Sequence, residues 1–178
     1  MRRASPQRKR RSARTVSIQE RSAAVAGIFY PKEKRPLSDW VDQYLKSEAK
    51  PAPAVALIAP HGGDRISGEV AGSLWAQVKL PKTVLFLGPS HTGVGARFSV
   101  AGQGSWETPL GKLAIDEPLA KALVKGIPEL ELDPKAQESE HGIEVLLPFL
   151  QRVQRSARFV PVSLAQGDSA EAGRIGTA

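Results

Sequence analysis

TVLFLGPSHTG, at residues 83–93, is the stretch that decides the fold. Its continuous apolar run is typical of a strand buried on both faces, and the glycine and proline that follow end the strand just before His91. A second run, AVALIAPHGG at residues 54–63, has the same form and carries His61. The two runs predict parallel strands at 54–59 and 83–87. Both histidines would then emerge at one edge of the sheet, where open α/β sheets bind their ligands.

Periodic segments around these runs predict the rest of an α/β domain. Apolar residues recur every three or four positions at about 37–45 and 67–78, which indicates helices. The second of these helices would join the two strands as a right-handed crossover. Further along the chain we expect a loop or hairpin excursion at 98–115, helices at about 117–125 and 140–154, and a strand at 159–164. The expected fold is a mixed or mostly parallel central sheet flanked by helices.

The last predicted element is a short helix near the end of the chain. Asp168 and Glu171, three residues apart, have the spacing of a capping box. Only about ten residues follow Asp168, so the helix is short and one flank of the sheet is left without cover. We therefore expect the domain to be incomplete at its C-terminus.

Composition limits the chemistry that the chain can perform. The chain has 178 residues, no cysteine and three histidines, so a metal site needs imidazole nitrogen and oxygen ligands. Such ligands suit iron, zinc, copper or manganese. No apolar run reaches the ~20 residues of a membrane helix, and no stretch has the charged-then-apolar pattern of a signal peptide. We expect a cytoplasmic protein without a membrane partner.

The net charge of +7 lies almost entirely in the first twenty residues. Residues 1–20 hold seven Lys and Arg against one acid, whereas residues 21–178 hold 18 basic and 17 acidic side chains. We expect a disordered basic arm at 1–20 and one domain at 21–178. A tether to nucleic acid or membrane, a transit peptide and a solvated tail all stay open for the arm, and nucleic-acid binding is expected nowhere else.

His61 and His91 are the predicted metal ligands, because neutral imidazole is a common ligand and glycines beside both rings let the backbone approach. The alternative is that each ring only caps a helix or binds a loop carbonyl. His141 and Glu144 are the candidate catalytic pair, on one face of the helix that His141 opens. Glu140 and Glu144 could instead complement the dipole at the start of this helix, an interpretation that is favoured for Glu140 and left open for Glu144. The helix N-terminus would keep the His141 ring neutral, as a general acid or base requires.

The remaining pocket candidates are Ser90 and Trp106. Ser90 precedes His91, and Trp106 either lines the pocket or belongs to the core. Gly88 and Gly93 have the spacing of a phosphate loop, but the lysine and hydroxyl residue that such a loop requires are missing. No nucleotide or organic cofactor is expected.

Several blocks resemble one known family. They are AVAGIFYP (24–31), IAPHGG (58–63), LGPSHTG (87–93), WETPLG (106–111), and EHGIE (140–144) with LPFL (147–150). In this order they resemble the Memo family, over about residues 22–165. Its bacterial and archaeal members are called AmmeMemoRadiSam system protein B, and its animal member is the mediator of ErbB2-driven cell motility.

The resemblance implies a fold similar to class III extradiol dioxygenases, with iron or copper as cofactor. His61 and His91 match histidines that line the family's metal site, and His141 matches one nearby. The implied function is a metal-dependent, dioxygenase-like oxidoreductase of unknown substrate. A non-enzymatic scaffold for metal or peptide, or an inactive truncated product, is the alternative. Implied partners are a small molecule or peptide and other AmmeMemoRadiSam system proteins.

The chain departs from the family pattern in two places. Asp64 and Arg65 stand where the family usually has a tyrosine, and Asp64 is a candidate oxygen ligand in its place. The family's later Ser-Ser-Asp…His block and its ligand cysteine have no counterpart here. The resemblance thus implies the N-terminal two-thirds of a Memo-like domain, residues 21–178, with two protein ligands instead of three.

Overall fold

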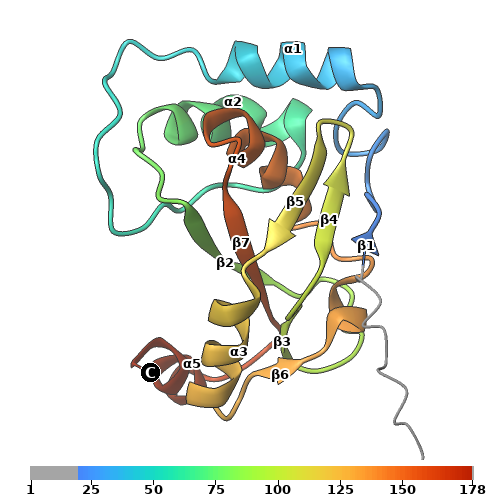
Figure 1. The fold of residues 1–178 in the computed structure, drawn as a ribbon, viewed down its shortest axis with the longest axis vertical. Helices are drawn as coiled ribbons and strands as arrows, with labels where there is room; N and C mark the ends of the chain where they lie inside the picture. Colours follow the sequence, from blue (N-terminus) through green and yellow to red (C-terminus); the bar gives the residue numbers. More distant parts are fainter. Residues whose placement is uncertain (1–19, 178) are drawn as a thin grey trace, which may run out of the picture.

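A computed structural model describes residues 20–177 and shows a mixed sheet between two groups of helices (Figure 1). The strands are β1 (Glu20–Arg21), β2 (Thr83–Pro89), β3 (Phe98–Val100), β4 (Ser105–Thr108), β5 (Gly111–Ile115), β6 (Glu131–Leu132) and β7 (Arg158–Leu164). The helices are α1 (Lys34–Tyr44), α2 (Asp64–Ala76), α3 (Glu117–Gly126), α4 (Leu147–Val153) and α5 (Ser169–Thr177), with short 3-10 turns η1 (Pro134–Gln137) and η2 (Glu144–Leu146). The predicted basic arm lies outside the described residues apart from Glu20. Among the described residues, no helix is long and apolar enough to cross a bilayer.

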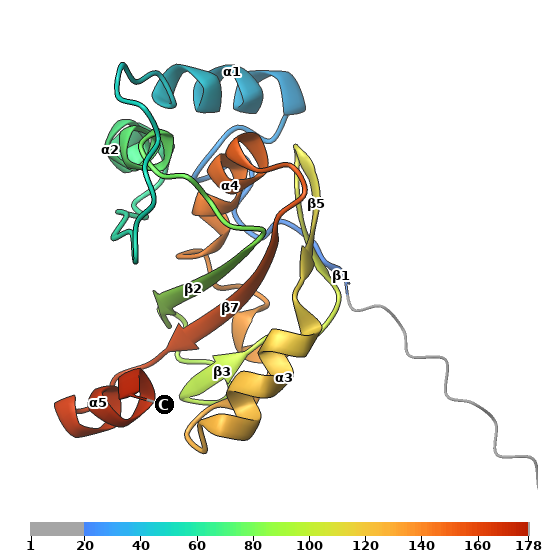
Figure 2. The same cartoon turned by 60° about the vertical axis from the view of Figure 1, so that its left-hand side comes forward.

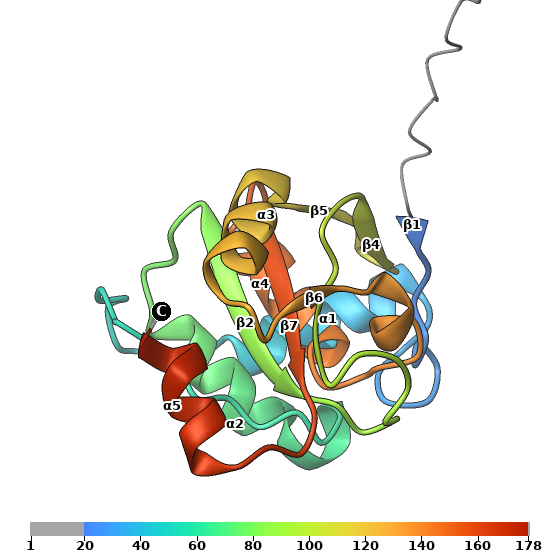
Figure 3. The same ribbon diagram turned by 90° about the horizontal axis from the view of Figure 1, so that it is seen from below.

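β7 is the central strand of the sheet. It pairs in parallel with β2 along its whole length, from Thr83 opposite Arg158 to Pro89 opposite Leu164. On its other side β7 meets β5 in parallel at one end and β3 in antiparallel at the other. β4 forms a hairpin with β5, and β1 and β6 add short parallel pairs. The predicted mixed sheet with flanking helices is confirmed, and β2 lies at its edge (Figures 2 and 3).

A chain of aromatic rings joins the helices to the sheet. Trp75 of α2 stacks on Phe86 of β2, with ring centroids 5.9 Å apart. The edge of Phe86 meets Phe159 of β7 at 6.1 Å, and Trp106 of β4 meets Phe159 at 5.4 Å. All four rings are buried. Because large aromatic side chains contribute much of the apolar area of a core, this row fixes α2 against β2 and β7.

The predicted strand at 54–59 is wrong. The segment between Pro53 and His61 contains no strand, and the side chain of Ile58 is 93% exposed. An all-apolar strand needs cover on both faces, and nothing within residues 20–177 covers Val55 or Ile58. The segment therefore stays a loop, although its composition favours a strand.

The predicted helix at 140–154 begins later than expected. Residues 141–143 form a turn before η2 and α4. The Glu140 carboxylate accepts hydrogen bonds from the amides of His141 and Gly142, and this side-chain capping replaces a first helical turn there.

The short C-terminal helix is confirmed together with its capping box. The Asp168 amide donates to the Glu171 carboxylate at 3.0 Å, and the Glu171 amide donates to Asp168 at 2.8 Å. Local side-chain chemistry was enough to predict the start of α5.

Gly72 lets α1 and α2 approach closely, and Gly72→Ala is expected to destabilise the protein by about 1–3 kcal/mol. A Cβ at this position would lie 2.6 Å from the Tyr44 carbonyl oxygen, so the two helices would have to separate. Urea unfolding followed by circular dichroism measures the loss. The control is Gly173→Ala in α5, where a Cβ meets nothing within 4 Å and no loss is expected.

Candidate metal centre

The structure brings the three histidines together from three separate segments. His61 lies just before α2, His91 lies just after β2, and His141 lies in the turn before η2. The Nε2 atoms of His61 and His91 are 3.3 Å apart. The His91 and His141 rings stack with centroids 4.2 Å apart, and the His61 and His141 centroids are 6.3 Å apart. The expected convergence of His61 and His91 is present, although no pair of neighbouring strands produces it.

Phe29 holds His61 and His141 in place from the N-terminal segment. The Asp64 amide donates to the Phe29 carbonyl oxygen at 2.9 Å, which anchors the turn after His61. Gly63 in this turn has φ 88, and a Cβ there would lie 3.2 Å from Phe29, so the close approach requires glycine. The Phe29 ring also packs on the His141 ring at 4.6 Å.

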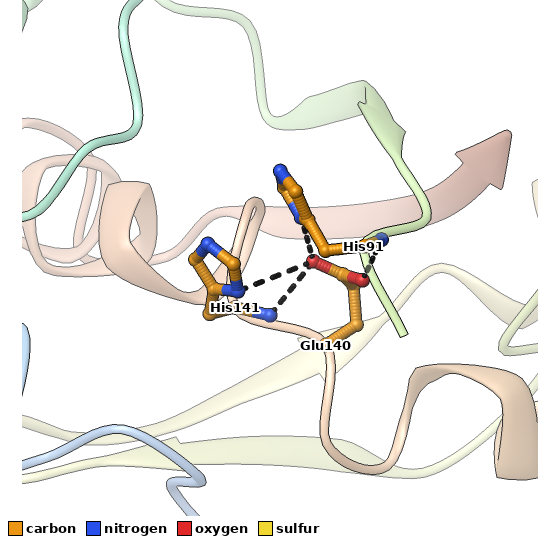
Figure 4. A group of neighbouring side chains, drawn as sticks. All are labelled: His91, Glu140 and His141. Atoms are coloured by element: carbon orange, nitrogen blue, oxygen red, sulfur yellow. Dashed lines mark hydrogen bonds and ion pairs between the residues drawn. The ribbon is translucent and has the colours of Figure 1, made fainter. Parts of the chain in front are cut away.

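The Glu140 carboxylate accepts hydrogen bonds from both His91 and His141 (Figure 4). One carboxylate oxygen accepts from His91 Nδ1 at 2.6 Å and from the His141 and Gly142 amides at 2.9 and 3.0 Å. The other accepts from the His91 amide at 2.6 Å. Burial alone would raise the pKa of Glu140, but the hydrogen bonds from the His91 side chain, Gly142 and the His91 amide lower it to about 2. Glu140 is therefore a carboxylate at neutral pH.

This carboxylate fixes the orientation of the His91 ring. Because Nδ1–H donates to Glu140, Nε2 carries the free lone pair and faces His61. Gly142 leaves room for this arrangement, since a Cβ there would lie 3.2 Å from the His91 ring and 3.5 Å from the His61 ring.

The environment favours the neutral form of His61 and of His141. Burial lowers the pKa of His61 and of His141, and the nearby His91 lowers both further. Neutral imidazole is the form that binds metals. His141 lies in a turn and not at the start of a helix, so burial takes the place of the predicted helix dipole.

His91, Glu140 and His141 form a cluster that could hold a metal ion, with ligand atoms all within 4.8 Å of one another. Glu140 already accepts four hydrogen bonds, which suits a residue that orients a ligand better than a direct ligand. Sequence reasoning missed this residue, because an acid at the start of a predicted helix was interpreted as a partner of the helix dipole. The signal that could have identified Glu140 is its position directly before His141 in the sequence.

Glu144 lies outside the cluster and binds the N-terminal segment. Its buried carboxylate accepts from Arg21 at 2.6 Å, from the Tyr30 hydroxyl at 2.7 Å and from the amides of Ala24 and Val25 at 2.9 and 3.0 Å. These four hydrogen bonds give Glu144 a structural role, and its catalytic role stays a prediction.

The other pocket candidates lie at different depths. Ser90 is half-buried beside His91, and its amide donates to the Leu164 carbonyl at 2.9 Å. Trp106 is buried under the Arg21 guanidinium, which lies 4.0 Å from its ring, as its core alternative predicts. Asp64, the first residue of α2, is buried, and one of its carboxylate oxygens has no hydrogen-bond partner. Desolvation raises the pKa of Asp64 to about 7. Asp64 and Trp106 do not belong to the described cluster, and their roles in a pocket stay predictions.

Comparison with known proteins identifies the family. A family model described as "Memo-like protein" matches residues 21–178. A MEMO1 family protein of Methanopyrus kandleri is 40% identical over 173 residues, covering 89% of this chain and 61% of the relative. A MEMO1 family protein of Aquifex aeolicus is 39% identical over 147 residues, covering 80% of this chain and 54% of the relative. The chain belongs to the Memo family, as its sequence blocks predicted, and it spans little more than half the length of these relatives.

Glu144→Gln is expected to lower the free energy of unfolding by about 2–4 kcal/mol. The change removes the charge that faces the buried Arg21 guanidinium and leaves Arg21 without its ionic partner. Chemical unfolding at pH 7 measures the loss. Glu138→Gln, an exposed acid in the same loop, is the matched control and should change stability little. A loss for Glu144→Gln as small as that of the control would contradict the structural role.

Asp64→Asn is expected to stabilise the protein, and more so at high pH. The folded-state pKa of about 7 lies above the ordinary aspartate value of 3.8, so the wild type loses stability as the pH rises from about 4 to about 7. The advantage of Asp64→Asn over the wild type should grow by about 2 kcal/mol between pH 5 and pH 8. Unfolding at both pH values measures it, and the exposed Asp39→Asn is the control. If the stability of Asp64→Asn relative to the wild type were the same at both pH values, the raised pKa of Asp64 would be refuted.

Proposed function

We propose that this chain binds one iron or copper ion through His61 and His91, with His141 beside the ion as the acid or base. The ion would serve a dioxygenase-like oxidoreductase that acts on a small molecule or peptide. The observation that carries the proposal is the 3.3 Å separation of the His61 and His91 Nε2 atoms, with Glu140 holding the far side of the His91 ring.

The donor set fits a metal ion. Two imidazole nitrogens that share a tetrahedral ion, each ~2.1 Å from it, lie about 3.4 Å apart, close to the separation of the two Nε2 atoms. A carboxylate that orients the ring, as Glu140 orients His91, is a usual neighbour of a ligand histidine. With no cysteine in the chain, nitrogen and oxygen are the available donors, and these suit iron and copper.

Each residue of the cluster has a distinct task in this proposal. Glu140 keeps the proton on Nδ1 of His91 and leaves Nε2 free to bind. His141, packed between Phe29 and His91, can also hold or release a proton beside a bound substrate. The side chain of His91 is 37% exposed, so a substrate can reach the centre from solvent. A bound iron or copper ion would supply Lewis acidity and electron transfer.

The oxidoreductase part of the proposal rests on the family resemblance to class III extradiol dioxygenases. Because the chain covers 61% of the Methanopyrus kandleri relative, the activity of a complete Memo protein is itself part of the proposal. The resemblance also implies a further ligand from the part of the relatives that this chain does not match.

Metal loading tests the binding step. After anaerobic, reductive incubation with Fe(II), or with Cu(II) in air, we expect about one bound ion per chain by elemental analysis. His91→Ala should abolish this stoichiometry, because it removes the central ring. Glu140→Gln should weaken binding by about 10- to 100-fold in calorimetric titrations, since the orienting carboxylate is lost.

Glu138→Gln is the matched control in the same loop and should bind like the wild type, with circular dichroism confirming that every variant is folded. Less than a tenth of an equivalent in the wild type would overturn the proposal. Binding without oxygen uptake in the presence of a catechol would leave the metal site and favour the scaffold function.

A further inference from the structure

An open cleft of about 740 Å³ lies where the two ends of the sheet come together (Figure 3). β1 and β6 stand at opposite ends of the strand order, yet the cleft is lined by β1, by β4 and by η1, which follows β6. Its size is that of ordinary small-molecule sites, roughly 300–1,000 Å³. None of its described lining residues belongs to the histidine cluster, so the cleft is distinct from the candidate metal centre.

The Arg21 guanidinium, in the wall of this cleft, has hydrogen-bonding capacity left over. Of its five N–H groups, one each on Nε, Nη1 and Nη2 donates to the Gln137 carbonyl, the Glu144 carboxylate and the Glu140 carbonyl. Within residues 20–177 the other two N–H groups have no acceptor, although the side chain is only 8% exposed. Because a buried donor without a partner is costly, an anionic oxygen in the cleft would bind here favourably.

Side chains of both charges line the cleft. Lys135 joins Arg21 on the basic side, and Glu20 and Glu138 are the acids. Glu20 is paired with Lys112 at 2.7 Å. Lys135 and Glu138 are exposed, and no ion pair within the described chain includes either of them. Since two basic and two acidic side chains balance, the lining as a whole favours a ligand that carries both charges over a simple anion or cation.

The rest of the wall includes an apolar surface. Trp106 and Ala101 are buried side chains of the core that line the cleft, and Ala24 and Pro134 lie beside them. One face of the Trp106 ring is covered by Arg21, whose guanidinium carbon lies 4.0 Å from the ring centroid. Apolar walls with a few polar groups that fix orientation are typical of sites for small organic ligands.

We propose that this cleft binds a free α-amino acid with a large apolar side chain. The ligand carboxylate accepts hydrogen bonds from Arg21 and Lys135, the ammonium group donates to Glu138, and the side chain packs against Trp106. Arg21 distinguishes the cleft from a chance grouping of surface charges, because it is buried and still has donors to offer. This site is independent of a bound metal ion.

Calorimetric titration of the full chain without added metal tests the proposal. L-phenylalanine and L-leucine are the probes, and we expect one-to-one binding with a Kd of about 1 mM or below. L-phenylalaninamide lacks the carboxylate, and N-acetyl-L-phenylalanine lacks the ammonium group. Each should bind at least about tenfold more weakly than L-phenylalanine, because each loses one charge-assisted contact.

Lys135→Gln locates the bound amino acid in this cleft. It should weaken L-phenylalanine by about tenfold and the amide hardly at all, because Lys135 contacts the carboxylate that the amide lacks. The matched control is Lys125→Gln in α3, an exposed lysine outside the cleft, which should bind like the wild type. Circular dichroism checks that both variants are folded.

Three results would overturn the proposal. The first is the absence of saturable binding of both amino acids up to about 10 mM, a concentration well above the expected Kd. The second is equal affinity for L-phenylalanine and its two blocked forms, which would show that the charges are not recognised. The third is unchanged binding in Lys135→Gln, which would place the ligand elsewhere on the protein.

Discussion

A buried ion pair between Arg21 and Glu144, 123 residues apart in the chain, holds together the parts that the histidine cluster requires. The Arg21 guanidinium also donates to the carbonyls of Gln137 and Glu140, and it stacks on Trp106. Burying a guanidinium is costly unless its donors are satisfied, so the N-terminal segment and the loop at 137–144 are tied to one arrangement. That arrangement sets the backbone of Glu140 beneath His91.

Two carboxylates four residues apart, Glu140 and Glu144, have different roles in this loop. Glu144 is satisfied by donors from the N-terminal segment and keeps the loop attached to the fold. Glu140 is satisfied by donors from the site and sets the orientation of His91. Each is nearly inaccessible to solvent, and their partners alone distinguish them. The chemistry of the centre therefore depends on tertiary contacts from distant parts of the chain.

Sequence reasoning succeeded where local signals decide the structure. β7 and the capping box of α5 follow from apolar runs and from side chains three residues apart. It failed for residues 54–59, because an apolar run becomes a strand only when neighbours cover it. It assigned the catalytic carboxylate to Glu144 and a helix-dipole role to Glu140. The hydrogen bonds that separate them come from residues 21–30 and from His91, which no local pattern contains.

The contact between His61 and His91 spans 30 residues that include α2 and β2. An ion bound by both His61 and His91 would link the two ends of this 30-residue segment. Because the ion would bind both rings in the folded chain and not in the unfolded one, it would stabilise the helix and the edge strand together. The ordering of this half of the domain would then follow the free concentration of the ion, and a chelator would loosen it without cutting any covalent bond.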